Sequence, residues 1–109
     1  MAARSSAGTL PVNPTIYNVT MTVADIEYSQ QLSIYTKKFL IHTRDETEFR
    51  LAFETLHVAT PTEPYLTIPQ GSRYYEDDLF LRVQTTDWNG TIYFASDSAA
   101  KVIEIVEWI

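Results

Sequence analysis

The chain contains no cysteine, and it has only three glycines and two histidines among its 109 residues. The lack of cysteine excludes disulfides, thiolate metal sites and cysteine nucleophiles, and it fits synthesis in a reducing compartment. Gly8, Gly71 and Gly90 are isolated from one another, so no glycine-rich phosphate-binding loop can be built. No stretch approaches the ~18 consecutive apolar residues of a membrane span, and the N-terminal residues lack the apolar core of a signal peptide. We therefore expect a soluble protein, made in a cytoplasm and without a membrane partner.

Basic residues are also scarce. Eight Lys and Arg stand against fourteen Asp and Glu, which leaves a formal net charge of −6. Such a charge repels phosphate backbones, so a nucleic-acid partner is not expected. Apolar and aromatic residues are plentiful, at 45% and 13% of the chain, and this composition is far from that of disordered proteins. Length and composition together indicate one folded domain.

Residues 1–14 differ in composition from the rest of the chain, because they are mostly small and polar. The candidates for anchoring residues within this segment are Leu10, Pro11, Val12 and Pro14. A proline-containing run of this kind predicts an extended, polyproline-like arm. We therefore divide the chain into an N-terminal arm over residues 1–14 and a domain over residues 15–109.

From Thr15 onward, apolar and polar residues alternate with a period of two, which predicts β-strands. The alternation is clearest in EFRLAFET, with Phe49, Leu51 and Phe53 predicted inward and Arg50, Ala52 and Glu54 outward. Prolines mark HVATPTEP as a loop, RYYE and LFLRVQ as separate strands follow it, and Asn89-Gly90 predicts a tight turn. About eight or nine short strands are typical of a sandwich or barrel. We predict an all-β fold, a jelly-roll-like antiparallel β-sandwich with an extended N-terminal arm.

The last segment, KVIEIVEWI, carries apolar side chains on both faces of an extended strand, and Glu104 and Glu107 interrupt one face each. Its β-branched residues favour a strand over a terminal helix that would begin near Asp97. Two interpretations fit this pattern: a central strand buried within one sandwich, or a strand that packs against another copy. The second predicts a subunit interface made of Ile103, Ile105, Trp108 and Ile109.

Residues that could carry chemistry are few. A histidine-based metal site in a β-barrel needs closely spaced histidines together with a carboxylate, whereas His42 and His57 stand far apart. No G-x-S-x-G motif supports a nucleophilic serine. The acidic run Glu76-Asp77-Asp78 lacks the spacing of a calcium loop, so we interpret it as a solvated turn. We predict no catalytic residue, no metal and no cofactor.

Four aromatic residues lie near predicted loop edges: Tyr65, Tyr74, Tyr75 and Trp88. They either close the ends of the core or present rings to a partner protein or a glycan. Because Tyr74 and Tyr75 are neighbours on a predicted strand, one of them must face away from the core of its own sheet.

The stretches EYSQ, RLAFET, YLTIPQGSRYYEDDL, TIYFAS and VIEIVEW follow one another in a characteristic order. In that order, over roughly residues 15–109, the chain resembles small β-rich virion structural proteins of tailed bacteriophages. Residues 31–35 and the 14-residue arm depart from the pattern of that group. The resemblance implies a non-enzymatic subunit, most simply a capsid decoration or cement protein that binds the major capsid protein and stabilises the head. The alternative is a head-fibre or tail component that binds a carbohydrate or a host receptor.

A cement subunit would lie on the capsid surface of the virion, after synthesis in the host cytoplasm. The arm would anchor it there by ordering on contact, and the C-terminal strand would pack against another copy, most economically in a homotrimer. A small hydrolase that depends on His42 or His57 is the remaining alternative.

Overall fold

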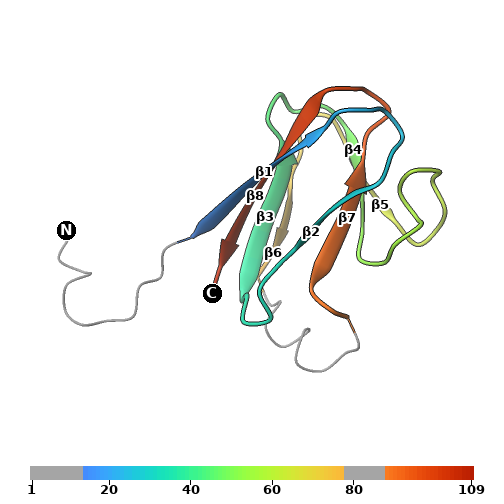
Figure 1. Cartoon of the computed structure of the whole chain (residues 1–109). Helices are drawn as coiled ribbons and strands as arrows, with labels where there is room; N and C mark the ends of the chain where they lie inside the picture. Colours follow the sequence, from blue (N-terminus) through green and yellow to red (C-terminus); the bar gives the residue numbers. More distant parts are fainter. Residues whose placement is uncertain (1–13, 78–87) are drawn as a thin grey trace, which may run out of the picture.

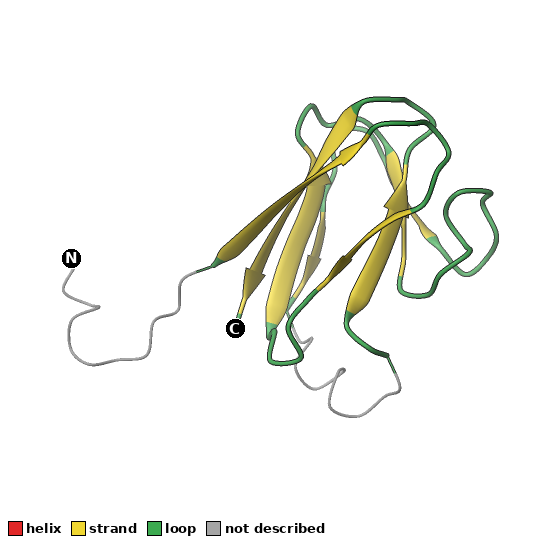
Figure 2. Cartoon of the chain, viewed as in Figure 1, coloured by secondary structure: helices red, strands yellow, loops and turns green. Residues whose placement is uncertain are grey.

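The computed structural model describes residues 14–77 and 88–109. Within them the chain forms strands and no helix (Figures 1 and 2). The strands are β1 (Thr15–Met21), β2 (Tyr28–Gln31), β3 (Lys38–Thr43), β4 (Phe49–Ala52), β5 (Leu66–Ile68), β6 (Tyr74–Glu76), β7 (Thr91–Ala95) and β8 (Lys101–Trp108). The predicted all-β class is confirmed, and the C-terminal segment is a strand rather than a helix. The strand expected over LFLRVQ lies outside the described residues.

The strands form two four-stranded antiparallel sheets that lie as two layers (Figure 2). Sheet A has the order β1-β8-β3-β6, and sheet B has the order β2-β7-β4-β5. The chain passes from one sheet to the other after every strand except β4, which pairs directly with β5. The predicted antiparallel sandwich is therefore confirmed at the level of its two sheets.

The core lies between the inner faces of the two sheets, and the period-two pattern decides which side chains enter it. Phe39 and Ile41 on β3 are fully buried, as are Ile92 and Phe94 on β7. Burying one such side chain contributes roughly 1.5–3 kcal/mol relative to leaving it in water. The predicted inward positions of β4 are confirmed for Phe49 and Leu51, which are 1% and 0% exposed.

The turn before β7 uses the conformational freedom of glycine. Gly90 has a φ of +85°, a conformation that side chains disfavour. A Cβ at this position would also lie 3.2 Å from the carbonyl oxygen of Leu32, whose amide donates to the Gly90 carbonyl at 2.9 Å. Gly90 thus fixes how the end of β2 meets the start of β7.

The outer face of sheet B is covered by the chain itself. Ala52 was predicted to face outward, and it does lie opposite the core side of β4, but it is only 2% exposed. The loop between β4 and β5 folds over it, and Val58 packs there against Ala52 and Ala95. The prediction was correct in direction but wrong in implying contact with water, because alternation specifies a face and not what covers it.

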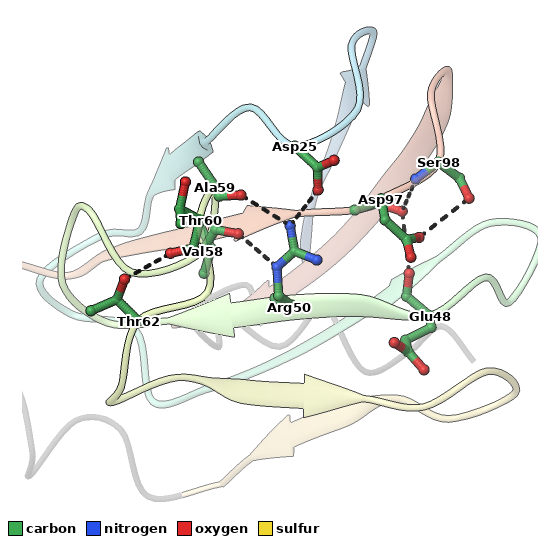
Figure 3. A network of polar contacts seen from close by, with 10 residues as sticks. Asp25, Glu48, Arg50, Val58, Ala59, Thr60, Thr62, Asp97 and Ser98 are labelled. Carbon is green, nitrogen blue, oxygen red and sulfur yellow. Dashed lines mark hydrogen bonds and ion pairs between the residues drawn. The ribbon is translucent and has the colours of Figure 1, made fainter.

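A charged side chain holds this loop in place (Figure 3). Arg50 Nε donates to the Val58 carbonyl at 2.6 Å, and its Nη2 donates to the Ala59 carbonyl at 3.4 Å and to the Asp25 carboxylate at 2.9 Å. The Arg50 side chain is only 12% exposed. Because hydrogen bonds from a charged donor are among the stronger ones, this guanidinium fastens the loop to sheet B.

Candidate functional site

The outer face of sheet A carries a row of apolar side chains that crosses all four strands. The strand register aligns Ile16 with Val106, Val106 with Leu40, and Leu40 with Tyr75. Ile16 is 62% exposed and Tyr75 is 50% exposed, while Leu40 and Val106 between them are half-buried. Cross-strand neighbours on one face lie within contact distance, so these four residues form a continuous apolar strip.

Trp108 extends this strip at the end of β8. Its ring meets the ring of Tyr75 edge-on, with centroids 6.5 Å apart and an interplanar angle of 82°. The ammonium of Lys38 lies 5.3 Å from the centroid of the Trp108 ring, within the range of a cation–π contact. The outer patch is defined here as Ile16, Leu40, Tyr75, Val106 and Trp108.

The same face becomes polar along the next row of residues. Glu104 faces outward between Asn18 and His42 in the register. Its carboxylate accepts a hydrogen bond from Arg44 Nε at 2.7 Å and lies 3.5 Å from His42 Nε2. The outer patch therefore has a polar border on one side.

A buried carboxylate on the opposite side of β8 fixes the end of the strand. Glu107 is 1% exposed and accepts hydrogen bonds from the hydroxyls of Tyr17 and Thr36 and from the Ser33 amide at 3.1 Å. The hydrogen bond to Glu107, together with burial and the nearby negative charge, raises the pKa of Tyr17 to about 12. Three strand and loop segments are joined at this one carboxylate.

The loop between β2 and β3 adds two exposed apolar side chains at this end of the molecule. Ile34 and Tyr35 are 51% and 59% exposed. The loop is tied to β8 because the Lys37 amide donates to the Trp108 carbonyl at 2.8 Å. Ile34 and Tyr35 belong to residues 31–35, the stretch that was expected from the sequence to depart from the pattern of the phage group.

The four aromatic residues singled out in the sequence do not form one platform. Tyr74 packs on Phe39 with centroids 5.7 Å apart, and Trp88 packs edge-on against Phe53 at 5.3 Å. Tyr75 belongs to the outer patch, so Tyr74 and Tyr75 point to opposite faces as predicted. Tyr65 packs on the cluster beneath the loop over sheet B. These rings therefore serve three separate places in the molecule.

The predicted subunit-interface residues also separate. Ile103 and Ile105 are 0% exposed and contribute to the core, so their side chains face the chain's own opposite sheet. Trp108 faces outward and is half-buried, and Ile109 is 50% exposed. β8 is a central strand of sheet A with a buried inner face and a partly open outer face. Only the outer half of the predicted interface is accessible to a partner.

Of the four predicted anchoring residues in the arm, three lie outside the described residues: Leu10, Pro11 and Val12. Pro14 is the first described residue, and it is exposed immediately before β1.

An open pocket of about 260 Å³ lies beside β4 and β5. Its lining consists of Leu51, Ala52, Phe53, Glu54, Pro64, Tyr65 and Leu66. The lining is mostly apolar, and Tyr65 and Phe53 supply its rings. This volume lies below the range of about 300–1,000 Å³ that is typical of small-molecule pockets.

The titratable residues weighed in the sequence have structural partners. His42 Nδ1 lies 2.8 Å from the Thr43 carbonyl, and His57 Nδ1 lies 2.7 Å from the Thr62 carbonyl. Glu76 was interpreted as part of a solvated turn, but it ends β6 at 8% exposure and accepts a hydrogen bond from the Tyr74 hydroxyl at 2.9 Å. That interpretation was wrong for Glu76, because this residue shares the inner face of the sheet with Phe39 and Glu107.

Within the described residues, no group of three or more His, Cys, Asp and Glu side chains is arranged to hold a metal ion. A helix long and apolar enough to cross a membrane is likewise not found among residues 14–77 and 88–109.

Sequence reasoning missed Ile16 and Leu40 as surface residues. Both lie in strands whose alternation placed them opposite the core, which is the signal that could have identified them. Their alignment with Val106 and Tyr75 depends on strand register and could not be obtained from spacing alone.

Comparisons of the chain with models of protein families, with curated proteins and with solved structures found no match. The surface described above is therefore the basis on which a function is proposed.

Proposed function

We propose that this chain is a non-enzymatic virion structural protein, a capsid decoration subunit that docks through the outer patch of sheet A. The observation that carries the proposal is the apolar strip that spans the four strands from Ile16 to Tyr75 and continues to Trp108. An isolated chain in water gains no stability from exposing such a strip, whereas a subunit bound to a shell covers it.

The strand order supports the further proposal that the sandwich is a jelly roll. The antiparallel pairs β1–β8, β2–β7, β3–β6 and β4–β5 are those of one long ribbon rolled into two sheets. Jelly rolls of eight strands are found in viral capsid proteins and in lectins, so the architecture suits both the decoration hypothesis and its carbohydrate-binding alternative. The choice between the two rests on the surface, as it must for any fold with many functions.

The kinds of side chain on this surface favour docking on a protein. The outer patch has aromatic and aliphatic side chains in the middle and an ion-paired border formed by Glu104 and Arg44. A protein interface usually has an apolar centre and a polar rim, and the outer patch has the apolar centre and one such border. Trp108 and Tyr75 are the expected hot spots, because large rings contribute most to such contacts.

The test is co-sedimentation with heads assembled from the major capsid protein of the same genome and prepared without this chain. The wild-type chain should co-sediment, and Val106→Asp should reduce its affinity by about tenfold or more, because a charge is then desolvated in the interface. The matched control is Ser29→Asp, which places the same charge on the exposed outward side of β2 in sheet B and should leave binding unchanged. Equal binding of wild type and Val106→Asp would refute docking through this face.

The arm is a second contact in this proposal. Deleting the arm, residues 1–14, should lower capsid occupancy while the domain over residues 15–109 stays folded. Unchanged occupancy would remove the arm from the proposal and leave the outer patch as the docking site.

The pocket beside β4 and β5 favours a second candidate function, the binding of a carbohydrate. Tyr65 offers a ring on which a sugar could stack, and Glu54 lies in the lining to accept a hydrogen bond. A glycan array probed with the wild type and with Tyr65→Ala tests this function. A glycan signal that disappears in Tyr65→Ala, with no binding to heads, would replace the decoration hypothesis.

A further inference from the structure

β1 is an edge strand of sheet A. One side of it pairs with β8, and its other side is unpaired among residues 14–77 and 88–109. It has seven residues, whereas the other three edge strands, β2, β5 and β6, have four, three and three. Folded proteins usually protect such an edge with a short strand, a charge or a proline. The sequence of β1, TIYNVTM, has no charged residue and no proline.

The backbone groups that face the open edge can be identified from the register. The Arg44 amide donates to the Val102 carbonyl at 2.8 Å, so the even-numbered residues of β8 bond toward β3. The odd-numbered residues of β8 consequently bond toward β1, where they meet Tyr17 and Val19. The backbone N–H and C=O groups directed at the open edge are therefore those of Ile16, Asn18 and Thr20.

We propose that two copies of this chain associate by antiparallel pairing of their β1 strands about a twofold axis at Asn18. In this register Asn18 faces Asn18 of the second copy, and Ile16 faces its Thr20, so each outward-directed backbone group finds a partner. A strand that adds to an exposed edge gains main-chain hydrogen bonds in the same way as a bound peptide does. The contact is isologous and closes after two copies.

The distribution of charge supports a second copy as the occupant of this edge. Two chains with a net charge of −6 repel one another over most orientations, but β1 brings no charged side chain into the contact. The nearest acidic side chain on the outer face is Glu104, one strand further in, and Arg44 and His42 accompany it. The two Glu104 side chains would be separated by three strand spacings, about 14 Å, which exceeds the screening length of about 8–10 Å.

The twofold pair differs from the trimer suggested by the sequence, in which the C-terminal strand would pack against another copy. A ring of three copies joined edge to edge would have to pair β1 with a different edge of the sheet, and the other edge strand, β6, has three residues within the described part of the chain. Pairing β1 with itself uses the full seven-residue strand. The axis is perpendicular to the sheet, so both outer patches face the same side and can dock on one surface.

The exposed position at the proposed axis allows a direct test, because the chain has no cysteine of its own. In an H-bonded antiparallel pair the facing Cα atoms are about 5.5 Å apart, which a disulfide can bridge. Full-length Asn18→Cys should therefore form a covalent dimer under mild oxidation. The matched control, Thr20→Cys, lies on the same strand and face but opposite Ile16 of the second copy, so it should cross-link at least about tenfold more slowly.

Sedimentation equilibrium of the full chain should give twice the monomer mass of 12.5 kDa. Asn18→Pro removes an N–H directed at the open edge without removing a bond to β8, so it should weaken the dimer by about tenfold or more. Asn18→Ala keeps that N–H and should leave the dimer unchanged. Circular dichroism verifies folding, and if Asn18→Pro fails to fold, the cysteine pair decides.

A monomer at every concentration would overturn the proposal, as would three copies or equal cross-linking of the two cysteine variants. A dimer that Val106→Asp disrupts and Asn18→Pro leaves intact would place the self-contact on the outer patch and refute pairing of β1. Because loss of capsid binding in Val106→Asp is measured separately, failure of the edge pairing and failure of the proposed function give different results.

Discussion

The outer faces of the two sheets differ in how they are covered. On sheet B the loop between β4 and β5 folds back, buries Val58 completely and is held by Arg50. On sheet A the outward side chains from Ile16 to Tyr75 have no such cover from the described part of the chain. One face is covered by a segment of the chain itself, whereas residues 14–77 and 88–109 leave the other uncovered, and it is there that we propose a partner docks.

The size of the outward side chains accounts for this difference. Sheet B presents Ala52 and Ala95 at the centre of its outer face, and these small residues leave room for Val58. Sheet A presents large side chains, of which Leu40 and Val106 are only half-buried. The small side chains at the centre of sheet B are matched by Val58 from a segment near in sequence, whereas the larger outward side chains of sheet A have no such match within the described residues.

The largest difference between the two faces is expected when a carboxylate is placed on the outer face of each sheet. Val58→Asp should lower the free energy of unfolding by about 3–5 kcal/mol, because the charge would be buried without a partner. Val106→Asp should cost about 1 kcal/mol, because this side chain retains access to water. Chemical denaturation measures both. Equal losses for the two variants would contradict the difference between the faces.

Substitution of one arginine on each sheet should give a smaller difference in stability between the two faces. Arg50→Met should cost about 1.5–3 kcal/mol, because it removes charged hydrogen bonds to the loop that covers sheet B. Arg44→Met, which breaks the exposed pair with Glu104 on sheet A, should cost less than about 1 kcal/mol. Amide exchange should reveal loop opening in Arg50→Met only. Protection of the loop that is unchanged in this variant would show that the guanidinium does not hold it.

The pH dependence of stability tests the buried carboxylate beneath the outer patch. Tyr17 has its pKa raised from 10.0 to about 12 by the hydrogen bond to Glu107. Because the unfolded chain ionises first, the stabilisation is complete below pH 10, falls as the pH rises above it, and is lost above about 12. Denaturation of wild type and Tyr17→Phe across this range should show the additional decline only in wild type. Parallel curves would refute the assignment.

The smallest effect is expected in the exposed turn that follows β3. The hydrogen bond from Lys101, supported by Thr47, lowers the pKa of Asp45 from 3.8 to about 2. The stabilisation is present above pH 3.8 and is lost as the pH falls toward 2. Carbon NMR titration should find the low pKa in wild type and a value nearer 3.8 in Lys101→Met. A titration that does not change would exclude Lys101 as the cause.

The strand pattern in the sequence was sufficient to predict the two-faced strands. Alternation placed Phe49 and Leu51 inside, and it predicted that Tyr74 and Tyr75 would diverge. A period of two is a property of each strand alone, so the two faces of a strand can be predicted without knowing which strands are its neighbours. The same reasoning placed Glu104 and Glu107 on opposite faces of β8, as the structure has them.

The sequence could not predict which distant part of the chain each strand face would contact. Tyr17 donates a hydrogen bond to Glu107 although 90 positions separate them, and no local sequence pattern predicts a hydrogen bond between residues so far apart in the chain. The cover over Ala52 and the alignment of Ile16 with Val106 likewise depend on how strands pair. The interface predicted at Ile103 and Ile105 failed to distinguish the two sides of β8, because apolar side chains occupy both.

The most direct test of the account is a cryo-EM map of heads decorated with this chain. We predict that the outer face of sheet A, with Val106 and Trp108, lies against the capsid shell and that the loop over sheet B faces solvent. A map in which that loop contacts the shell while Trp108 points into solvent would contradict the account.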